Sequence, residues 1–359
     1  LEMYLRSFKR NIFPLLSFDI GLRVLVLLSL VLFWSEVISF EWFIIFNSLF
    51  YLIPTASLLI YLYYLNLLKF NFGIHISKRF RKLMYKYSVT NYINSLGAIL
   101  VYSLDILMVA QFLGLRATGV YTTIVFLTSA IQVPYKAIVR VSSPLIAEFW
   151  KTKNMVAMED IYKKVSSVSL VIGLGAFLLV WLNIDFLFSF LRSEFQEGIW
   201  VFFFLMMGRL LDMFFGLNGS IFATSKKYKY DLIFTVVLIL SVYMLNLYLI
   251  PIYGITGAAI STGLALVFYN IGRLLFVYFA FNLNPFNLRQ IPIIGIALGV
   301  FFLGDILSET FENNFAQFCF QITFVLGSFF TPILLFNLEP ESKAYLRNGL
   351  NYLKGKFKS

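Results

Sequence analysis

The sequence is poor in the residues on which most catalytic and metal centres depend. Its 359 residues include one cysteine, Cys319, and one histidine, His75. A single cysteine cannot form an intramolecular disulfide, and so few of these side chains argue against a Cys/His metal site and histidine-based catalysis. The chain also shows no glycine-rich phosphate loop and no nucleophile elbow. We therefore expect no enzyme activity, no metal site and no cofactor.

Charged residues and long polar segments are scarce as well. Only 13% of the residues are charged, 60% are hydrophobic, and the mean hydropathy is +0.83. Continuous apolar runs of about 20 residues recur along the chain, each long enough to cross a hydrocarbon core as a helix, whereas barrel strands would alternate. The composition thus predicts an all-α polytopic membrane protein with about ten transmembrane helices. The predicted spans are residues 12–33, 42–65, 89–112, 119–146, 165–191, 199–223, 231–250, 256–281, 291–307 and 316–337.

Basic residues are distributed unevenly between the loops. The chain holds 29 Lys and Arg residues against 18 Asp and Glu, a formal net charge of +11. Most of the basic residues outside the spans lie in alternate loops, and the opposite loops contain only Arg116 and Arg192. By the positive-inside rule the basic side is cytoplasmic, and the C-terminus lies on that side. The net charge then reflects topology and attraction to anionic membrane lipid, not nucleic-acid binding.

Two basic residues in the fourth predicted span are candidates for binding an anionic group. Lys136 and Arg140 lie four residues apart, between Pro134 and Pro144. Two prolines are typical of a bent helix beside a water-filled cavity, where the cations would form a patch suited to phosphate. The alternative is that both side chains snorkel to the cytoplasmic headgroups.

Two arginines lie deeper in later spans. Arg209 lies near the bilayer centre with Asp212 three residues away, so the two either pair with each other or line a cavity. Arg273 has no acid on its own predicted helix and is a further candidate for binding phosphate. Three mid-span amides either line a cavity or bridge helices: Asn94, Asn246 and Asn270.

Acidic residues within the spans are candidates for ion coupling. Asp19 and Arg23 lie four apart, so they form an ion pair on one helix face or line a cavity. Asp105 lies about 10 Å from the outer end of its span, too deep for a short carboxylate to reach water unaided. We expect Asp105 to face the cavity and to take up a proton or Na⁺ during transport, unless it pairs with a cation such as Arg116.

Several stretches resemble one family of transporters. DILMVAQFLGLRATGVYTTI (105–124) is similar to the start of the second lobe in polysaccharide flippases of the Wzx type, which belong to the multidrug/oligosaccharidyl-lipid/polysaccharide exporter superfamily. The likeness covers most of residues 1–281. Further similar segments are LRSFKR (5–10), VSSPLIAEFW (141–150) and FATSKKYKYDLIFTVVLILSVYMLNLYLIPIYGITGAAISTGLAL (222–266).

The resemblance implies a two-lobed helical fold around a central cavity, in which this chain is equivalent to helices 5–14 and lacks the first four. The implied organisation is a two-helix remnant of the first lobe (1–66), a basic amphipathic linker (67–88), a second six-helix lobe (89–281), two extra C-terminal helices (282–337) and a basic cytoplasmic tail (338–359).

The resemblance also implies a function in the cytoplasmic membrane of a bacterium or archaeon. Such flippases translocate oligosaccharide repeat units, such as those of O-antigen, linked by pyrophosphate to a polyprenol, by alternating access, and they work beside glycan polymerase machinery. Lys136, Arg140, Arg209 and Arg273 are then candidates for binding the pyrophosphate. Two other functions stay open: a cation-coupled exporter of drugs or metabolites from the same superfamily, and a membrane polysaccharide polymerase or acyltransferase, which the short outward loops disfavour.

Overall fold

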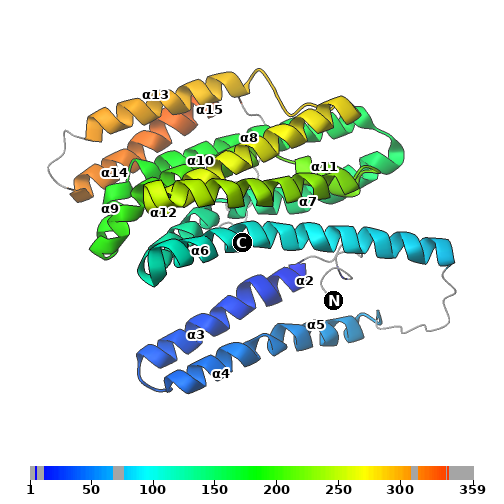
Figure 1. Ribbon diagram of the computed structural model, residues 1–359, viewed down its shortest axis with the longest axis horizontal. Coiled ribbons are helices and arrows are strands. Elements are labelled where there is room, and N and C mark those ends of the chain that lie inside the picture. Colours follow the sequence, from blue (N-terminus) through cyan, green and yellow to red (C-terminus); the bar gives the residue numbers. More distant parts are fainter. Residues whose placement is uncertain (1–4, 6–11, 68–76, 309–313, 337, 339–359) are drawn as a thin grey trace, which may run out of the picture. The chain divides into compact units, whose positions relative to one another are not determined.

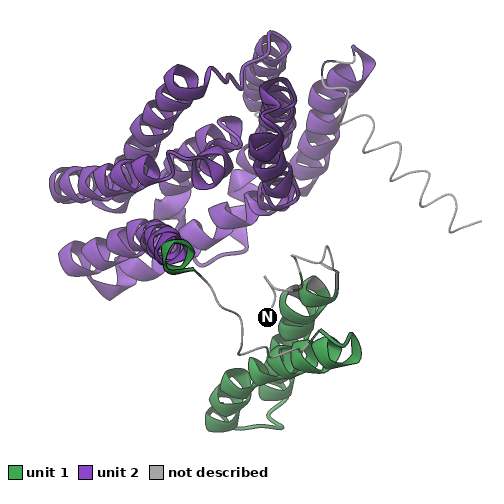
Figure 2. Cartoon of the chain, turned by 90° about the vertical axis from the view of Figure 1, so that its right-hand side faces the viewer, with its two compact units in different colours: residues 1–81 green, residues 82–359 purple. Residues whose placement is uncertain are grey.

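The protein consists of two compact helical units. The computed structural model describes residue 5 and residues 12–67, 77–308, 314–336 and 338. Unit 1 comprises Leu1–Arg81 and unit 2 comprises Lys82–Ser359 (Figure 2). Their boundary falls inside the predicted linker, of which residues 68–76 lie outside the described part of the chain, as do residues 339–359 of the predicted tail.

Unit 1 contains the first two predicted spans. The first is built from α2 (Ile12–Leu15), the π-helical turn η1 (Leu16–Gly21) and α3 (Leu22–Trp34), and the second from α4 (Phe40–Phe50) and α5 (Leu52–Tyr64). Buried side chains are few here: Leu5, Leu58 and Leu62 form a small cluster. Most apolar side chains of α3 and α4 are exposed, as expected for helices whose surroundings are lipid.

Unit 2 carries the other eight predicted spans (Figure 1). Its helices are α6 (Lys78–Ile131), α7 (Val133–Thr152), α8 (Met155–Trp181), α9 (Ile184–Ser189), the 3₁₀ turn η2 (Ser193–Gly198), α10 (Ile199–Phe214), α11 (Asn218–Thr224), α12 (Lys229–Phe281), α13 (Gln290–Ser308), α14 (Asn314–Val325), the π-helical turn η3 (Leu326–Phe330) and α15 (Thr331–Leu335).

Two of these helices are twice the length of a membrane span and fold back at a glycine. α6 has 54 residues and α12 has 53, and their only non-helical residues are Gly114 (φ 82°, ψ 178°) and Gly254 (φ 60°, ψ −140°). These backbone angles are accessible essentially to glycine alone. In Figure 1 both limbs of α12 extend from this turn toward the same end of unit 2, so that the chain is antiparallel in the two limbs. Each long helix therefore supplies two of the predicted spans.

The predicted fold class is confirmed. Among the described residues, seven helices are long and apolar enough to cross a membrane, or eight if the bent pair α10–α11 is one span, and two of the seven are the double-length helices. Every predicted span is mainly helical over its described residues, with interior breaks at residues 51, 132, 182–183 and 215–217. Residues 78–88 of the predicted linker are helical and continue directly into the next predicted span as part of α6, because no proline or glycine interrupts the chain there.

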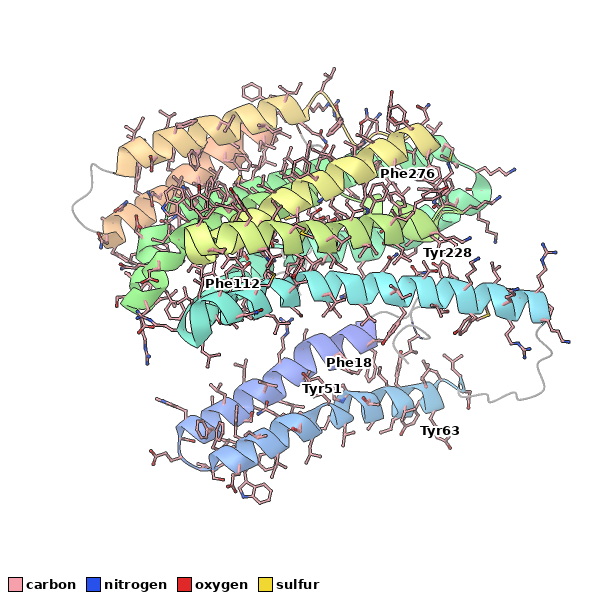
Figure 3. All side chains as sticks on the ribbon, viewed as in Figure 1. Phe18, Tyr51, Tyr63, Phe112, Tyr228 and Phe276 are labelled. Carbon is pink, nitrogen blue, oxygen red and sulfur yellow. The ribbon has the colours of Figure 1, made fainter. Side chains whose placement is uncertain are left out.

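The core of unit 2 forms where α10 packs against α8 and α12. Gly208 and Gly263 face each other: a Cβ atom added to Gly208 would lie 3.1 Å from the Cα atom of Gly263. Glycine at both positions lets the two backbones approach closely. Figure 3 shows Phe112 near one end of this unit and Tyr228 and Phe276 near the other. The second end carries the Lys-rich turn before α12 and is the one predicted to be cytoplasmic.

Candidate functional site

Asp105 is the centre of a buried polar cluster in unit 2. Its side chain is 2% exposed. Asn246 donates to Oδ1 at 2.6 Å, Tyr121 donates to Oδ2 at 3.1 Å, and Thr262 also donates to Oδ2. The four residues come from both limbs of α6 and both limbs of α12, and so the carboxylate joins four helical segments.

The cluster corrects two expectations about Asp105. The carboxylate is enclosed by protein groups and does not point into an open cavity. Arg116 does not reach it, because its guanidinium lies 3.4 Å from Glu194 in an exposed ion pair. A buried carboxylate needs compensation, and three donors supply it here. The Oδ1 atom of Asn246 is buried without a hydrogen-bond partner, so one acceptor beside the carboxylate is unsatisfied.

Arg209 is buried by protein and does not line an open surface. It is 2% exposed, and it donates to Oε1 of Gln132 and to the carbonyl oxygen of Val125, both at 3.2 Å. Its guanidinium also stacks over Tyr102, 5.5 Å from the ring centroid. No ion pair with Asp212 is found among the described residues. Gln132 lies between α6 and α7, so the hydrogen bond from Arg209 stabilises the chain where Pro134 interrupts the helix. In this conformation the buried Arg209 side chain is not available to a phosphate.

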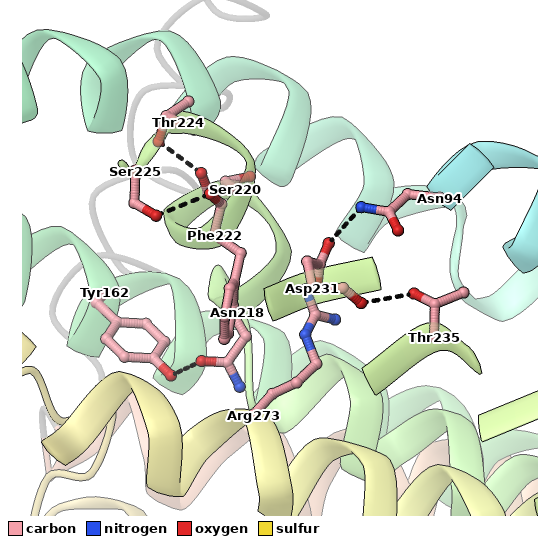
Figure 4. Close-up of polar contacts among 10 residues, drawn as sticks. All are labelled: Asn94, Tyr162, Asn218, Ser220, Phe222, Thr224, Ser225, Asp231, Thr235 and Arg273. Atoms are coloured by element: carbon pink, nitrogen blue, oxygen red, sulfur yellow. Dashed lines mark hydrogen bonds and ion pairs between the residues drawn. The ribbon is translucent and has the colours of Figure 1, made fainter. Parts of the chain in front are cut away.

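Arg273 forms a buried ion pair in unit 2. Its Nη2 atom lies 2.9 Å from Oδ1 of Asp231, with the two side chains 8% and 13% exposed. Asn94 of α6 donates to the other carboxylate oxygen at 3.3 Å (Figure 4). The guanidinium also lies over the rings of Phe222 and Tyr269, 5.3 and 4.8 Å from their centroids. The cluster ties α6, α11 and both limbs of α12 together near the predicted cytoplasmic end.

The ion pair borders a polar cleft of about 390 Å³ within unit 2. Asp212, which is half-buried, lines the same cleft. Arg273, Arg209 and Lys136 are the cations that act electrostatically on Asp212. Asp212 and Asp231 thus line the same cleft as Arg273. Three buried polar atoms of this cluster have no hydrogen-bond partner: Oδ1 of Asn94, Nε of Arg273, and Oδ1 of Asp231, which contacts Arg273 only as an ion pair.

Lys136 and Arg140 differ from the two arginines because both are exposed. They lie one turn apart on α7, which starts after the break at Gln132, has Pro134 in its first turn and contains Pro144 inside the helix. The helix is interrupted at Gln132, two residues before Pro134, and the bend predicted here stays a prediction. Of the four cations considered for binding an anionic substrate, these two are the ones with exposed side chains.

The predicted pair of Asp19 and Arg23 stays a prediction. Asp19 lies in the π-helical turn η1, and its side chain lies outside what the structure describes. Arg23 is exposed in the first turn of α3.

Some residues of the clusters around Asp105 and around the Arg273–Asp231 ion pair could be identified from the sequence as polar groups that need partners, and others could not. Asn246 and Asn94 were recognisable as mid-span amides, and both bridge helices. Asp231 was missed as the partner of Arg273 because it stands at the end of a Lys-rich turn and belongs to the preceding predicted span. Tyr121 and Thr262 could not be identified from the sequence, because a single hydroxyl residue is common in apolar spans and does not by itself indicate a polar cluster.

Comparisons with known proteins support the fold. No protein-family model and no curated protein matches the sequence. Among solved structures, the chain is similar to "Lipid II flippase MurJ, inward closed conformation", with a TM-score of 0.64 and 17% sequence identity over 92% of this chain and 69% of that chain. At this identity the likeness shows the fold alone: the chain is a multi-pass helical membrane protein with a flippase-type fold.

Proposed function

We propose that this protein is a transporter that moves a polyprenyl-pyrophosphate-linked oligosaccharide across the cytoplasmic membrane by alternating access. The observation that carries the proposal is the flippase-type fold over 92% of the chain, since the similar structure is named as a flippase of a lipid-linked substrate. The resemblance to polysaccharide flippases narrows the substrate to a glycan repeat unit for a surface polysaccharide, delivered to the polymerase machinery.

Lys136 and Arg140 are the residues proposed to bind the pyrophosphate. Both are exposed on α7, one turn apart, and a guanidinium offers paired donors to phosphate oxygens. Arg209 and Arg273 are proposed to act indirectly, because their donors are engaged by protein acceptors. Arg209 holds Gln132, which directly precedes the helix that carries the exposed cations, and Arg273 holds α6, α11 and α12 together.

Asp105 is proposed to couple transport to H⁺ or Na⁺. Its two hydroxyl partners can reverse their donation, and a rotated Asn246 amide would present its unpaired oxygen to the carboxyl group. The cluster can therefore accommodate either a protonated carboxyl or a small cation surrounded by oxygens. Because four helical segments meet at Asp105, a change of its charge alters the packing of all four.

The test is translocation by the purified full chain in vesicles, with a fluorescent polyprenyl-pyrophosphate oligosaccharide and a membrane-impermeant quencher. The Lys136→Gln/Arg140→Gln variant should lose most of the initial rate while folding normally. Lys151→Gln, an exposed cation near the end of the same helix, is the matched control and should keep the rate. Equal rates for the wild type and the double variant would exclude the pyrophosphate role. A rate equal to that of empty vesicles for the wild type itself would remove the transport proposal.

A further inference from the structure

A small polar cavity lies between α9 and α14, at the end of unit 2 predicted to face outward. Its volume is about 170 Å³. Five polar side chains line it: Asn183 and Asp185 from the start of α9, and Asn314, Gln317 and Gln321 from the first two turns of α14. The apolar part of the wall includes Phe186 and Phe318, whose rings stack on each other at 4.4 Å between centroids.

The hydrogen-bonding capacity of these side chains is almost unused by the protein. Asn183 and Gln321 are each 2% exposed. Asn183 donates to the carbonyl oxygen of Leu179 at 2.8 Å, but its Oδ1 atom is buried without a partner. Within the part of the chain that the structure describes, the side chains of Asp185, Asn314, Gln317 and Gln321 make no hydrogen bond to protein. Asn183 and Gln321 are the buried members of this set, whereas Asp185 and Asn314 are exposed and Gln317 is half-buried. Buried polar groups rarely stay unsatisfied, so the unpaired oxygen of Asn183 requires a partner inside the cavity.

The chemistry of the lining identifies the class of occupant. Each of the five side chains offers an sp² oxygen and one is a carboxylate, and among the described residues no Lys or Arg lines the cavity. Calcium is bound by six to eight such oxygens, with waters completing the shell, whereas Mg²⁺ requires stricter octahedral geometry and keeps more of its water. The unpaired atom of Asn183 is itself an acceptor and is satisfied by a cation.

We propose that this cavity is a Ca²⁺ site that fastens α14 to α9. With a single carboxylate, its affinity should fall in the range of about 10⁻⁴–10⁻³ M found for extracellular modules, which suits the outer side of a membrane. The site lacks cysteine and histidine, and its residues come from distant parts of the chain, so the sequence alone predicted no metal. It does not rest on the transport proposal.

Thermal unfolding of the purified full chain, with and without about 5 mM Ca²⁺, tests the site. Saturation of a site of this affinity should raise the melting temperature by about 3 °C. The shift should fall below about 1 °C in Asp185→Asn and in Gln321→Met, which removes an oxygen at similar volume. Glu197→Gln removes an exposed carboxylate from η2 and should leave the shift unchanged. Mg²⁺ should give a smaller shift than Ca²⁺.

Equilibrium dialysis with radioactive Ca²⁺ supplies a second readout that does not depend on stability. The wild type should bind one ion with a dissociation constant in the range given above, and Asp185→Asn should bind at least tenfold more weakly. The proposal is overturned if the wild type shows no binding, which would leave water as the occupant. It is equally overturned if wild type, Asp185→Asn and Glu197→Gln bind alike, which would mean nonspecific surface binding.

Discussion

Neutralising Asp231 should destabilise the protein far more than neutralising an exposed acid. Asp231→Asn removes the partner of Arg273, whose side chain is only 8% exposed and whose Nη2 atom lies 2.9 Å from the carboxylate. The guanidinium would keep its contacts with two aromatic rings but would lose its counter-ion inside the helical bundle. We expect the variant to fold, because asparagine has nearly the same shape.

The magnitude follows from the burial of the pair. At 2.9 Å and an effective dielectric constant of about 20, the Coulomb attraction is about 6 kcal/mol, most of which offsets the desolvation of the two charges. Removing one partner of such a buried pair costs about 3–5 kcal/mol. Allowing about 2 °C per kcal/mol for a chain of this size, the melting temperature should fall by roughly 6–10 °C.

A double-mutant cycle in detergent measures the coupling. Asp231→Asn with Arg273→Met removes both charges, so the double variant should be more stable than the sum of the two single effects by about 1–3 kcal/mol. The control is Glu159→Gln, which breaks the half-exposed i,i+4 pair with Lys163 at 2.6 Å and should cost about 0.3–0.5 kcal/mol. Strict additivity in the cycle, or an Asp231→Asn cost no larger than that of the control, would refute the reasoning.

The remaining predictions concern the turns and the buried carboxylate. Gly114→Ala and Gly254→Ala should each destabilise the protein by about 1–3 kcal/mol in thermal unfolding, because both glycines have positive φ. The control is Gly295→Ala, within α13 and with open space at its Cβ position, which should be neutral or stabilising. Equal effects of the three substitutions would contradict the account of the turns. Asp105→Asn should fold but make transport independent of the H⁺ or Na⁺ gradient, and unaltered dependence on both gradients would exclude coupling through this residue. Tyr121→Phe removes one of three donors and should lower stability by about 1–2 kcal/mol, with no change expected if the hydroxyl is unimportant.

The helical fold was predictable because its causes are local. Apolar runs long enough to cross a membrane, with basic residues in alternate loops, specify helices and their order without reference to any partner. The turn at Gly114 was also predictable, since a glycine at the end of an apolar run is the usual way to reverse direction. Local sequence patterns did not predict that the two limbs of α6, and likewise those of α12, would be separated by a single non-helical glycine.

The candidate site was predictable only in part, because its contacts join distant residues. The sequence identified Asp105, Arg209 and Arg273 as costly charges that need partners. It did not identify the partners: Asp231 lies 42 positions before Arg273, and the hydroxyl of Thr262 lies 157 positions after Asp105. Those pairings depend on how the limbs fold back, which single-helix spacing cannot encode.

The most direct test of the proposed function is the translocation of a polyprenyl-pyrophosphate-linked oligosaccharide by the full chain in vesicles. The account predicts a protein-dependent rate for this lipid, and a much lower rate for a polyprenol that carries the same oligosaccharide without the pyrophosphate, because Lys136 and Arg140 would have no phosphate to bind. Transport that does not distinguish the two lipids, or a rate no faster than in protein-free vesicles, would contradict it.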